Sequence, residues 1–437
     1  MNQFARVRML WPDHLGLARG KYMPTEFASN GAGHAAAVYS LGYDRSFEPT
    51  PGSGVLDGFP DMHATFEPSD LRQGWDDHLT GVAVCDLSMD GEPFGFSARY
   101  ALRKAIAEWE ELGFQPKVGI ELEAYVLEPD GEGGWKAWDT PESYVYGTGR
   151  FVDPTGLIDE INRRALGCDI VLESINGEFD QGQFELTLRY TDALKAADDA
   201  FLFRVLAREA AMEQGLRMTF LGKPFADLEG NGVHVNFSLL DGDGRNGLSD
   251  EGADDGLSSL AKGCLAGMCH HHQAMTALCA PTVNAYRRLQ PMTFSGRRAN
   301  WGYDHRMTGN RVPPARGQAT RLESRLPDGS CNVHTAIATV LQAARLGVVN
   351  ELPCPDAETN DGIETWNTEV TSALNLAEAL THLQADLVLT EAVSQDLVDN
   401  FVAIKENEWG RFTEATPDWE SAESITDWEK SQYLPYH

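Results

Sequence analysis

Five glutamates and one histidine lie in short segments, most of which alternate polar and apolar residues, and this pattern constrains the fold more than any other feature. Glu121 and Glu123 alternate with apolar residues in the segment 120–125, so both side chains point to one face of the predicted strand. An inward-facing row of glutamates is costly to bury unless cations neutralise it. Hard oxygen ligands with one imidazole suit magnesium or manganese. The sequence therefore predicts a multi-metal site on a β-sheet, with the ligands Glu121, Glu123, Glu178, Glu185, His234 and Glu323.

Five arginines interleave with these acids. Arg321 and Arg325 flank Glu323, and the guanidinium fork binds carboxylates and phosphates. Each motif taken alone is more typical of a solvated strand face or a surface ion-pair ladder. The occurrence of all these acidic and arginine motifs in one chain favours metal-assisted phosphoryl transfer between a nucleotide and a carboxylate substrate. The arginines concerned are Arg288, Arg306, Arg311, Arg321 and Arg325.

Composition limits the class of protein. The chain has 437 residues, a formal net charge of -31 and 42% hydrophobic residues, which suits a globular protein and argues against binding to nucleic acid or anionic membrane. No apolar stretch reaches the length of a membrane span, and the first ten residues lack the apolar region of a signal peptide. Seven cysteines without framework spacing are typical of reduced thiols. These features predict a cytoplasmic protein.

Two pieces are predicted along the chain. Residues 1–96 are strand-like and rich in turns, and an amphipathic helix then opens at residues 101–110. From residue 97 to 437, strands that carry the acids alternate with helices, which predicts an α+β domain. The expected helices include residues 192–214 and 258–278, with further terminal helices within 375–413.

The ordered motifs resemble the glutamine synthetase family over nearly the whole chain. The resemblance rests on Trp11-Pro-Asp-His-Leu-Gly-Leu-Ala-Arg-Gly-Lys21, Asn284-Ala-Tyr-Arg-Arg-Leu-Gln-Pro291 and Arg321-Leu-Glu-Ser-Arg-Leu-Pro-Asp328, together with the acidic segments. It implies an N-terminal β-grasp domain over residues 1–96 and a catalytic domain over residues 97–437. The catalytic domain would hold a curved antiparallel sheet with flanking helices.

The resemblance also implies a role for each matching residue. Glu123, Glu178 and Glu185 would bind one metal, and Glu121, His234 and Glu323 a second, with two or three Mg²⁺ or Mn²⁺ per site and ATP as co-substrate. ATP would convert the carboxylate of glutamate into an acyl phosphate that an amine attacks. The remaining implied roles are substrate binding by Arg288, Arg325, Asn231 and Gly232, nucleotide binding by Arg321, Arg311 and Asn236, and catalysis by Arg306, Asp13, Glu178 and Phe294.

Phe294 departs from the ammonia-using members of the family. Those members carry a glutamate six residues after the arginine that Arg288 matches, and position 294 here is an aromatic residue. A phenyl ring packs on an alkyl or aryl amine or attracts its cation, so the sequence favours a substituted organic amine. The alternatives are a glutamine synthetase that uses ammonia and a catalytically weak regulatory or scaffold homologue. The resemblance further implies a dodecamer of two hexameric rings, in which Asp13 reaches a neighbouring subunit's amine pocket.

Overall fold

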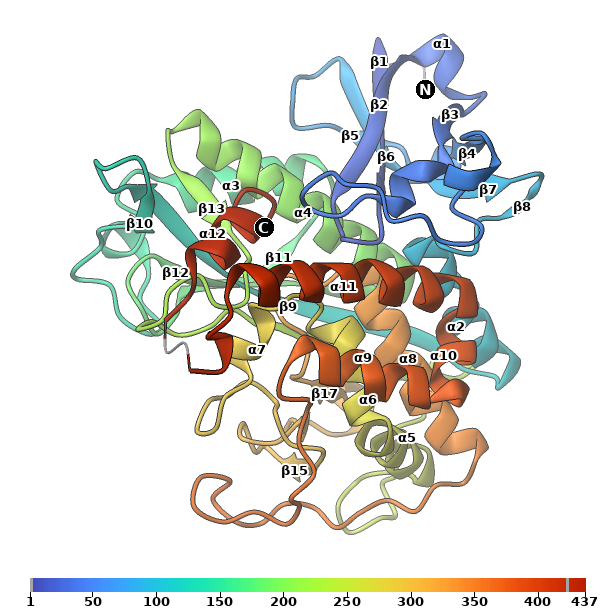
Figure 1. The fold of residues 1–437 in the computed structure, drawn as a ribbon. Coiled ribbons are helices and arrows are strands. Elements are labelled where there is room, and N and C mark those ends of the chain that lie inside the picture. The colour runs from blue at the N-terminus through green and yellow to red at the C-terminus, as the bar shows by residue number, and fades with distance from the viewer. Residues whose placement is uncertain (1–2, 422–423) are drawn as a thin grey trace.

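The computed structural model describes residues 3–421 and 424–437. The N-terminal part forms a lobe of two small sheets, drawn in blue in Figure 1. The first has the order β2-β1-β6-β5, with β1 and β6 parallel, and the second has the order β3-β4-β7-β8. The elements are β1 (Arg6–Pro12), β2 (Ala18–Pro24), α1 (Thr25–Ala28), β3 (Ala32–Ala35), β4 (Asp61–Thr65), β5 (Arg72–Gln73), β6 (Thr80–Val84), β7 (Asp86–Met89) and β8 (Glu92–Pro93).

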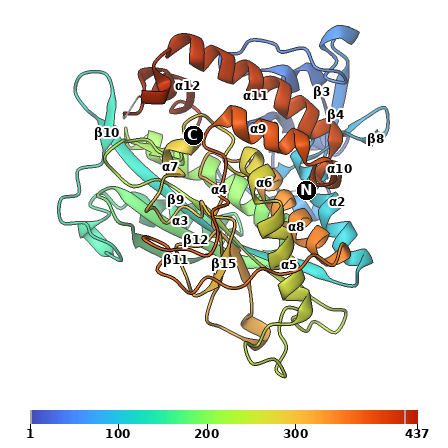
Figure 2. The same cartoon turned by 60° about the horizontal axis from the view of Figure 1, so that its bottom comes forward.

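A nine-stranded sheet forms the centre of the remaining chain. Its order is β11-β12-β9-β14-β17-β16-β15, with β10 and β13 also paired to β9, and only β15 and β16 run parallel. Figure 2 shows β9, β11 and β12 side by side. The strands are β9 (Gln115–Pro129), β10 (Trp135–Ala137), β11 (Leu172–Gly177), β12 (Gln183–Asp192), β13 (Arg217–Thr219), β14 (Val233–Leu240), β15 (Trp301–Tyr303), β16 (Asn310–Val312) and β17 (Leu322–Ser324).

Helices cover the apolar face of this sheet. Ile120, Leu122 and Ala124 on β9 are fully buried in the main core, and α2 and α4 pack against the same strand. The helices of this part are α2 (Ala98–Glu111), α3 (Leu157–Gly167), α4 (Ala193–Glu213), α5 (Ser259–His270), α6 (His272–Cys279), α7 (Ala285–Arg288), α8 (Val333–Val349), α9 (Leu376–Ala385), α10 (Leu387–Val393), α11 (Gln395–Ala415) and α12 (Asp427–Tyr433). None of the helices in the described ranges is long and apolar enough to cross a membrane.

Glycines allow α5 and α8 to pack closely. A Cβ on Gly267 would lie 2.0 Å from the carbonyl oxygen of Ala343, and one on Gly347 would lie 2.1 Å from that of Gly263. Nearly every side chain of α8 is buried, as expected for a helix that is apolar on all sides. The indole of Trp109 on α2 donates a hydrogen bond to the Leu341 carbonyl at 3.0 Å, which ties α2 to α8.

Most predicted helices are found, and one prediction is wrong. The helix predicted for residues 192–214 is α4, and α9 to α11 occupy the predicted terminal region. The helix predicted for residues 258–278 is two helices, α5 and α6, that meet at His271. The His271 ring bonds the Asp386 carboxylate at 2.6 Å, a contact between residues far apart in sequence. Local periodicity carries no information about such a contact.

Candidate active site

Strand pairing brings the acidic residues to one face of the central sheet. Glu121 on β9 lies opposite His234 on β14, and Glu123 lies opposite Glu185 on β12. Glu178 directly follows β11, and its backbone N–H donates to the Gln183 carbonyl at 2.9 Å. The alternation that buries Ile120, Leu122 and Ala124 therefore presents the glutamates on the opposite face.

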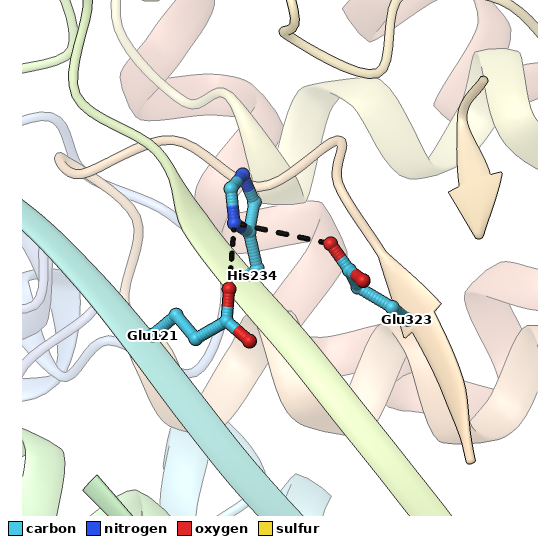
Figure 3. Close-up of side chains that lie close together, drawn as sticks. All are labelled: Glu121, His234 and Glu323. Carbon is cyan, nitrogen blue, oxygen red and sulfur yellow. Dashed lines mark hydrogen bonds and ion pairs between the residues drawn. The ribbon is translucent and has the colours of Figure 1, made fainter. Parts of the chain in front are cut away.

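Glu121, His234 and Glu323 form the first group of candidate metal ligands. Figure 3 shows their side chains converging from β9, β14 and β17. His234 Nδ1 lies 3.1 Å from Glu121 Oε2 and 4.0 Å from Glu323 Oε1. One ligand atom from each residue lies within 4.8 Å of the others, a spacing that a single ion can bridge.

Glu123, Glu178 and Glu185 form the second group, whose ligand atoms also lie within 4.8 Å of one another. Burial, followed by the charge of Glu123, raises the pKa of Glu178 to about 7. Burial and the neighbouring acids Glu121, Glu123 and Glu178 raise the pKa of Glu185 to about 8. Burial and repulsion between neighbouring carboxylates thus favour the protonated forms of Glu178 and Glu185.

The donor set fits divalent cations that prefer oxygen. Each group offers three protein atoms, which leaves coordination positions for oxygens of a substrate. Burial, followed by the charge of Arg325, lowers the pKa of His234 to about 3, so its ring is neutral and has a free lone pair for a metal. The six residues thus form two candidate clusters, and their role as metal ligands stays a prediction.

Arginines border both acidic groups. Arg311 donates to Glu323 at 2.6 Å and Arg325 donates to the same carboxylate, while Arg288 donates to the carbonyls of Arg325 and Leu326 at 3.2 Å. The Nε–H of Arg325 is buried and has no hydrogen-bond partner among the described residues. Such an unmade bond is costly, and an anionic substrate group would satisfy it. Arg306 is exposed and lines a cavity together with Arg288 and Arg325.

Amide groups hold the acids in place. The Asn236 side chain donates to Glu121 Oε1 at 3.0 Å and accepts from Arg321 Nε at 3.1 Å. The Gly232 N–H donates to Glu123 Oε2 at 2.5 Å. A Cβ on Gly232 would lie 2.6 Å from a terminal nitrogen of Arg288, so a larger residue at this position would displace the guanidinium. Asn231 is buried and bonds Leu221 and Gln183, which places it behind the acids rather than among them.

A cavity of about 320 Å³ opens above these groups. Arg288, Arg306 and Arg325 line it together with acids of the second group, and its aromatic members are Phe294, Phe179 and Tyr146. The sequence pointed to Phe294 but not to Phe179, Tyr146 or Val145, which also line the cavity. The position of Phe179 directly after the candidate ligand Glu178 could have indicated that it lies near the site. No sequence feature marks Tyr146, which lies in a loop with a left-handed backbone at φ 61°.

The structure does not bring Asp13 to this cavity. Its side chain is fully buried in its own β1–β2 turn, where Oδ1 accepts from the N–H groups of Leu15 and Leu17 at 2.9 Å. Its Oδ2 accepts from Arg19 at 2.7 Å. Both oxygens therefore have partners within the chain, which gives Asp13 a role in shaping this turn. A role in a neighbouring subunit stays a prediction.

Comparison with known proteins defines the family. Residues 96–424 match the model of the glutamine synthetase catalytic domain, and the chain belongs to the glutamine synthetase family. It is 33% identical to glutamine synthetase of Thermotoga maritima over 77% of this chain and 78% of that protein. It is 31% identical to gamma-glutamylethanolamide synthetase GlnA4 of Streptomyces coelicolor over 96% and 92%. The solved structure described as GmaS without ligand superposes with a TM-score of 0.82 at 29% identity, covering 99% of this chain and 97% of that one.

Family and fold together define the class of enzyme. The chain is an ATP-dependent carbon–nitrogen ligase with the glutamine synthetase fold. The relative named glutamine synthetase and the relative named γ-glutamylethanolamide synthetase are similarly identical to this chain, at 33% and 31%. The choice of amine therefore depends on the residues of the site itself.

Proposed function

We propose that the protein joins the γ-carboxylate of glutamate to a substituted organic amine at the expense of ATP. The observation that carries the proposal is the wall of the cavity: Phe294, Phe179, Tyr146 and Val145 face a space that also contains the acidic and arginine groups. The relative named for γ-glutamylethanolamide synthesis, aligned over almost the full length of both chains, supports an organic amine.

The two acidic groups would hold two divalent ions, with a third allowed by the number of carboxylates. Glu123, Glu178 and Glu185 would bind one ion, and Glu121, His234 and Glu323 the other. Bound magnesium or manganese would neutralise charge on the phosphate oxygens of ATP. The Asn236 side chain bonds both Glu121 and the guanidinium of Arg321, so Asn236 and Arg321 would bind the nucleotide next to this metal group. Arg311, which donates to Glu323, would also contact the nucleotide.

The arginines would bind and activate glutamate. Arg288 and Arg325 converge on the cavity, and the free Nε–H of Arg325 would donate to a substrate carboxylate. The backbone N–H of Gly232 donates to Glu123. Gly232 and the adjacent Asn231 would therefore hold this carboxylate beside the glutamate subsite. An oxygen of the γ-carboxylate attacks the γ-phosphorus of ATP and ADP leaves. Arg306, exposed on the cavity wall, would stabilise the charge on the transferring phosphoryl group.

The amine would enter past the aromatic wall. Its nitrogen attacks the acyl carbon, phosphate leaves, and the nitrogen loses a proton to a base. Glu178 directly precedes Phe179 and lines the same cavity, so its carboxylate would lie beside the amine and would accept this proton. Aromatic side chains in this place bind an alkyl or aryl substituent but offer ammonium no carboxylate.

ATP turnover with glutamate across a panel of amines tests the proposal. We expect organic primary amines to support faster turnover than ammonium at equal concentration. Faster turnover with ammonium would establish the second candidate, glutamine synthetase, which the Thermotoga relative favours. No turnover with any amine would favour a regulatory homologue.

We further propose a cytoplasmic dodecamer of two hexameric rings, built from the domains 1–96 and 97–437. The proposed boundary falls between the end of β8 at Pro93 and the start of α2 at Ala98, whose N-cap Ser97 accepts a hydrogen bond from the Tyr100 N–H. Light scattering of the active protein tests the assembly, and a fully active monomer would contradict it.

A further inference from the structure

A second and larger cavity lies away from the acidic groups. Its volume is about 660 Å³, roughly twice that of the candidate active site. Its walls include the β1–β2 turn, one side of α4, residues 215–220, the start of α8 and the C-terminal segment 435–437. Figure 1 shows the C-terminal end beside α4. The cavity therefore joins the N-terminal lobe to the helix that packs on β9 and β12.

Arginines dominate the lining of this cavity. Five arginines face it with Glu209 as the one acidic side chain among the described lining residues. Two of the five are neutralised: Arg8 donates twice to Glu209, at 3.0 and 2.7 Å, and Arg19 pairs with Asp13. The other three are Arg204, Arg208 and Arg217, and within the described residues none of them forms an ion pair.

Backbone carbonyls bind these three arginines without neutralising them. Arg204 donates to the carbonyls of Gly329 and Cys331, and Arg208 donates to those of Pro435 and Tyr436. Arg217 makes one long bond, 3.5 Å, to the Leu434 carbonyl. Burial and the like charges of Arg204 and Arg217 lower the pKa of Arg208 to about 10. Three cations thus share one cavity at a cost that a bound anion would relieve.

Further features of the cavity also favour an anion. The first turn of α8, beginning at its N-cap Asn332, lies on the wall, and the positive end of a helix dipole attracts negative charge. Arg204 lies 5.2 Å from the ring of Phe220, and Arg217 lies 4.5 Å from that of Trp135, so aromatic rings hold two guanidinium planes in place. The rest of the chain carries a large negative net charge, so this cationic surface is a local feature.

We infer that this cavity is a second binding site, for a small molecule with two or more anionic groups. Arg204 and Arg208 are one helical turn apart on α4, about 5–6 Å, so they would bind separate carboxylate or phosphoryl groups. Arg217, at the start of β13, would bind a further oxygen from the opposite side. The ligand would link α4 to the β1–β2 turn and to the C-terminal segment.

Titration calorimetry of the assembled protein tests the site, with citrate as one probe and inorganic pyrophosphate as the other, in the absence of divalent metal. We expect at least one probe to bind, and Arg217→Gln and Arg208→Gln each to weaken binding at least tenfold. Binding of citrate alone would identify a polycarboxylate ligand, and binding of pyrophosphate alone a phosphorylated one. Arg217→Gln removes only one long hydrogen bond, so it serves where Arg208→Gln unfolds the protein.

Two controls separate this site from others. Arg163→Gln changes an exposed arginine on α3 whose one ion-pair partner among the described residues is Glu160, and it should leave binding unchanged. Arg325→Gln changes the candidate active site and should also leave probe binding at the second cavity unchanged. No binding of either probe, or binding that Arg325→Gln abolishes and Arg208→Gln and Arg217→Gln preserve, would overturn the inference. Neither result bears on amine ligation.

Discussion

Metal binding by the second acidic group should depend steeply on pH. Glu178 and Glu185 have pKa values of about 7 and about 8, and a divalent ion binds their anions, so protons compete with the metal. If binding requires both anions, the metal affinity should fall about 500-fold between pH 8 and pH 6. For two carboxyls with the ordinary pKa of 4.5, the affinity would fall by less than about 10% over the same range. His234 adds nothing to this dependence, because its pKa of about 3 keeps it neutral over the whole range.

Titration calorimetry with Mg²⁺ or Mn²⁺ in buffers of different ionisation enthalpy measures the protons released. We expect about two protons per ion at pH 6 and about one at pH 7.5, from the two pKa values. Glu185→Gln should lower the release at pH 6 by about one proton and weaken binding, because it removes both a titrating group and a ligand. An affinity that changes less than about twofold between pH 6 and pH 8 would refute the reasoning.

Three further predictions concern single residues. Phe294→Glu should shift the ratio of specificity constants at least about tenfold toward ammonium, since the ring contact is worth about 1–3 kcal/mol; Phe151→Glu, an equally exposed phenylalanine outside the cavity, should leave the ratio unchanged. Glu323→Ala should lower metal-dependent turnover at least about 100-fold in a folded protein, and wild-type turnover would remove Glu323 from the site. Because the raised pKa of Glu185 makes its ionisation destabilising above pH 4.5, Glu185→Gln should raise the melting temperature of the metal-free protein by roughly 2 °C or more at pH 8 and much less at pH 5.

Local pattern in the sequence predicts the parts of the site that depend on strand alternation. The spacing of Glu121 and Glu123 was enough to place both on one face of β9, and the structure confirms that face. The pairing partners could not be read from it, because other strands and helices separate β9 from β12 and from β14 along the chain. Strand alternation alone did not divide the six candidate ligands into two metal groups. That division came from the resemblance to the family, which rests on the ordered motifs.

Loops and long-range contacts account for what was missed. Tyr146 lines the cavity from a loop in which its own backbone is left-handed, a conformation that is uncommon for a residue other than glycine and that the sequence does not indicate. Asp13 occurs in a motif that suggested a catalytic group, yet its own turn supplies partners for both oxygens. At the break between α5 and α6, His271 bonds Asp386, which lies more than a hundred residues away in sequence.

Direct competition between amines tests the central claim most directly. The protein is incubated with glutamate, ATP and Mg²⁺ in the presence of equal concentrations of ammonium and a primary alkylamine, and the two amides are quantified by mass spectrometry. In the proposed site Phe294, Phe179 and Tyr146 would contact the substituent of the amine, and Phe294 stands where ammonia-using members carry a carboxylate, so the γ-glutamyl alkylamide should exceed glutamine at least about tenfold. An excess of glutamine for every alkylamine tried would contradict the proposed function and identify the protein as a glutamine synthetase.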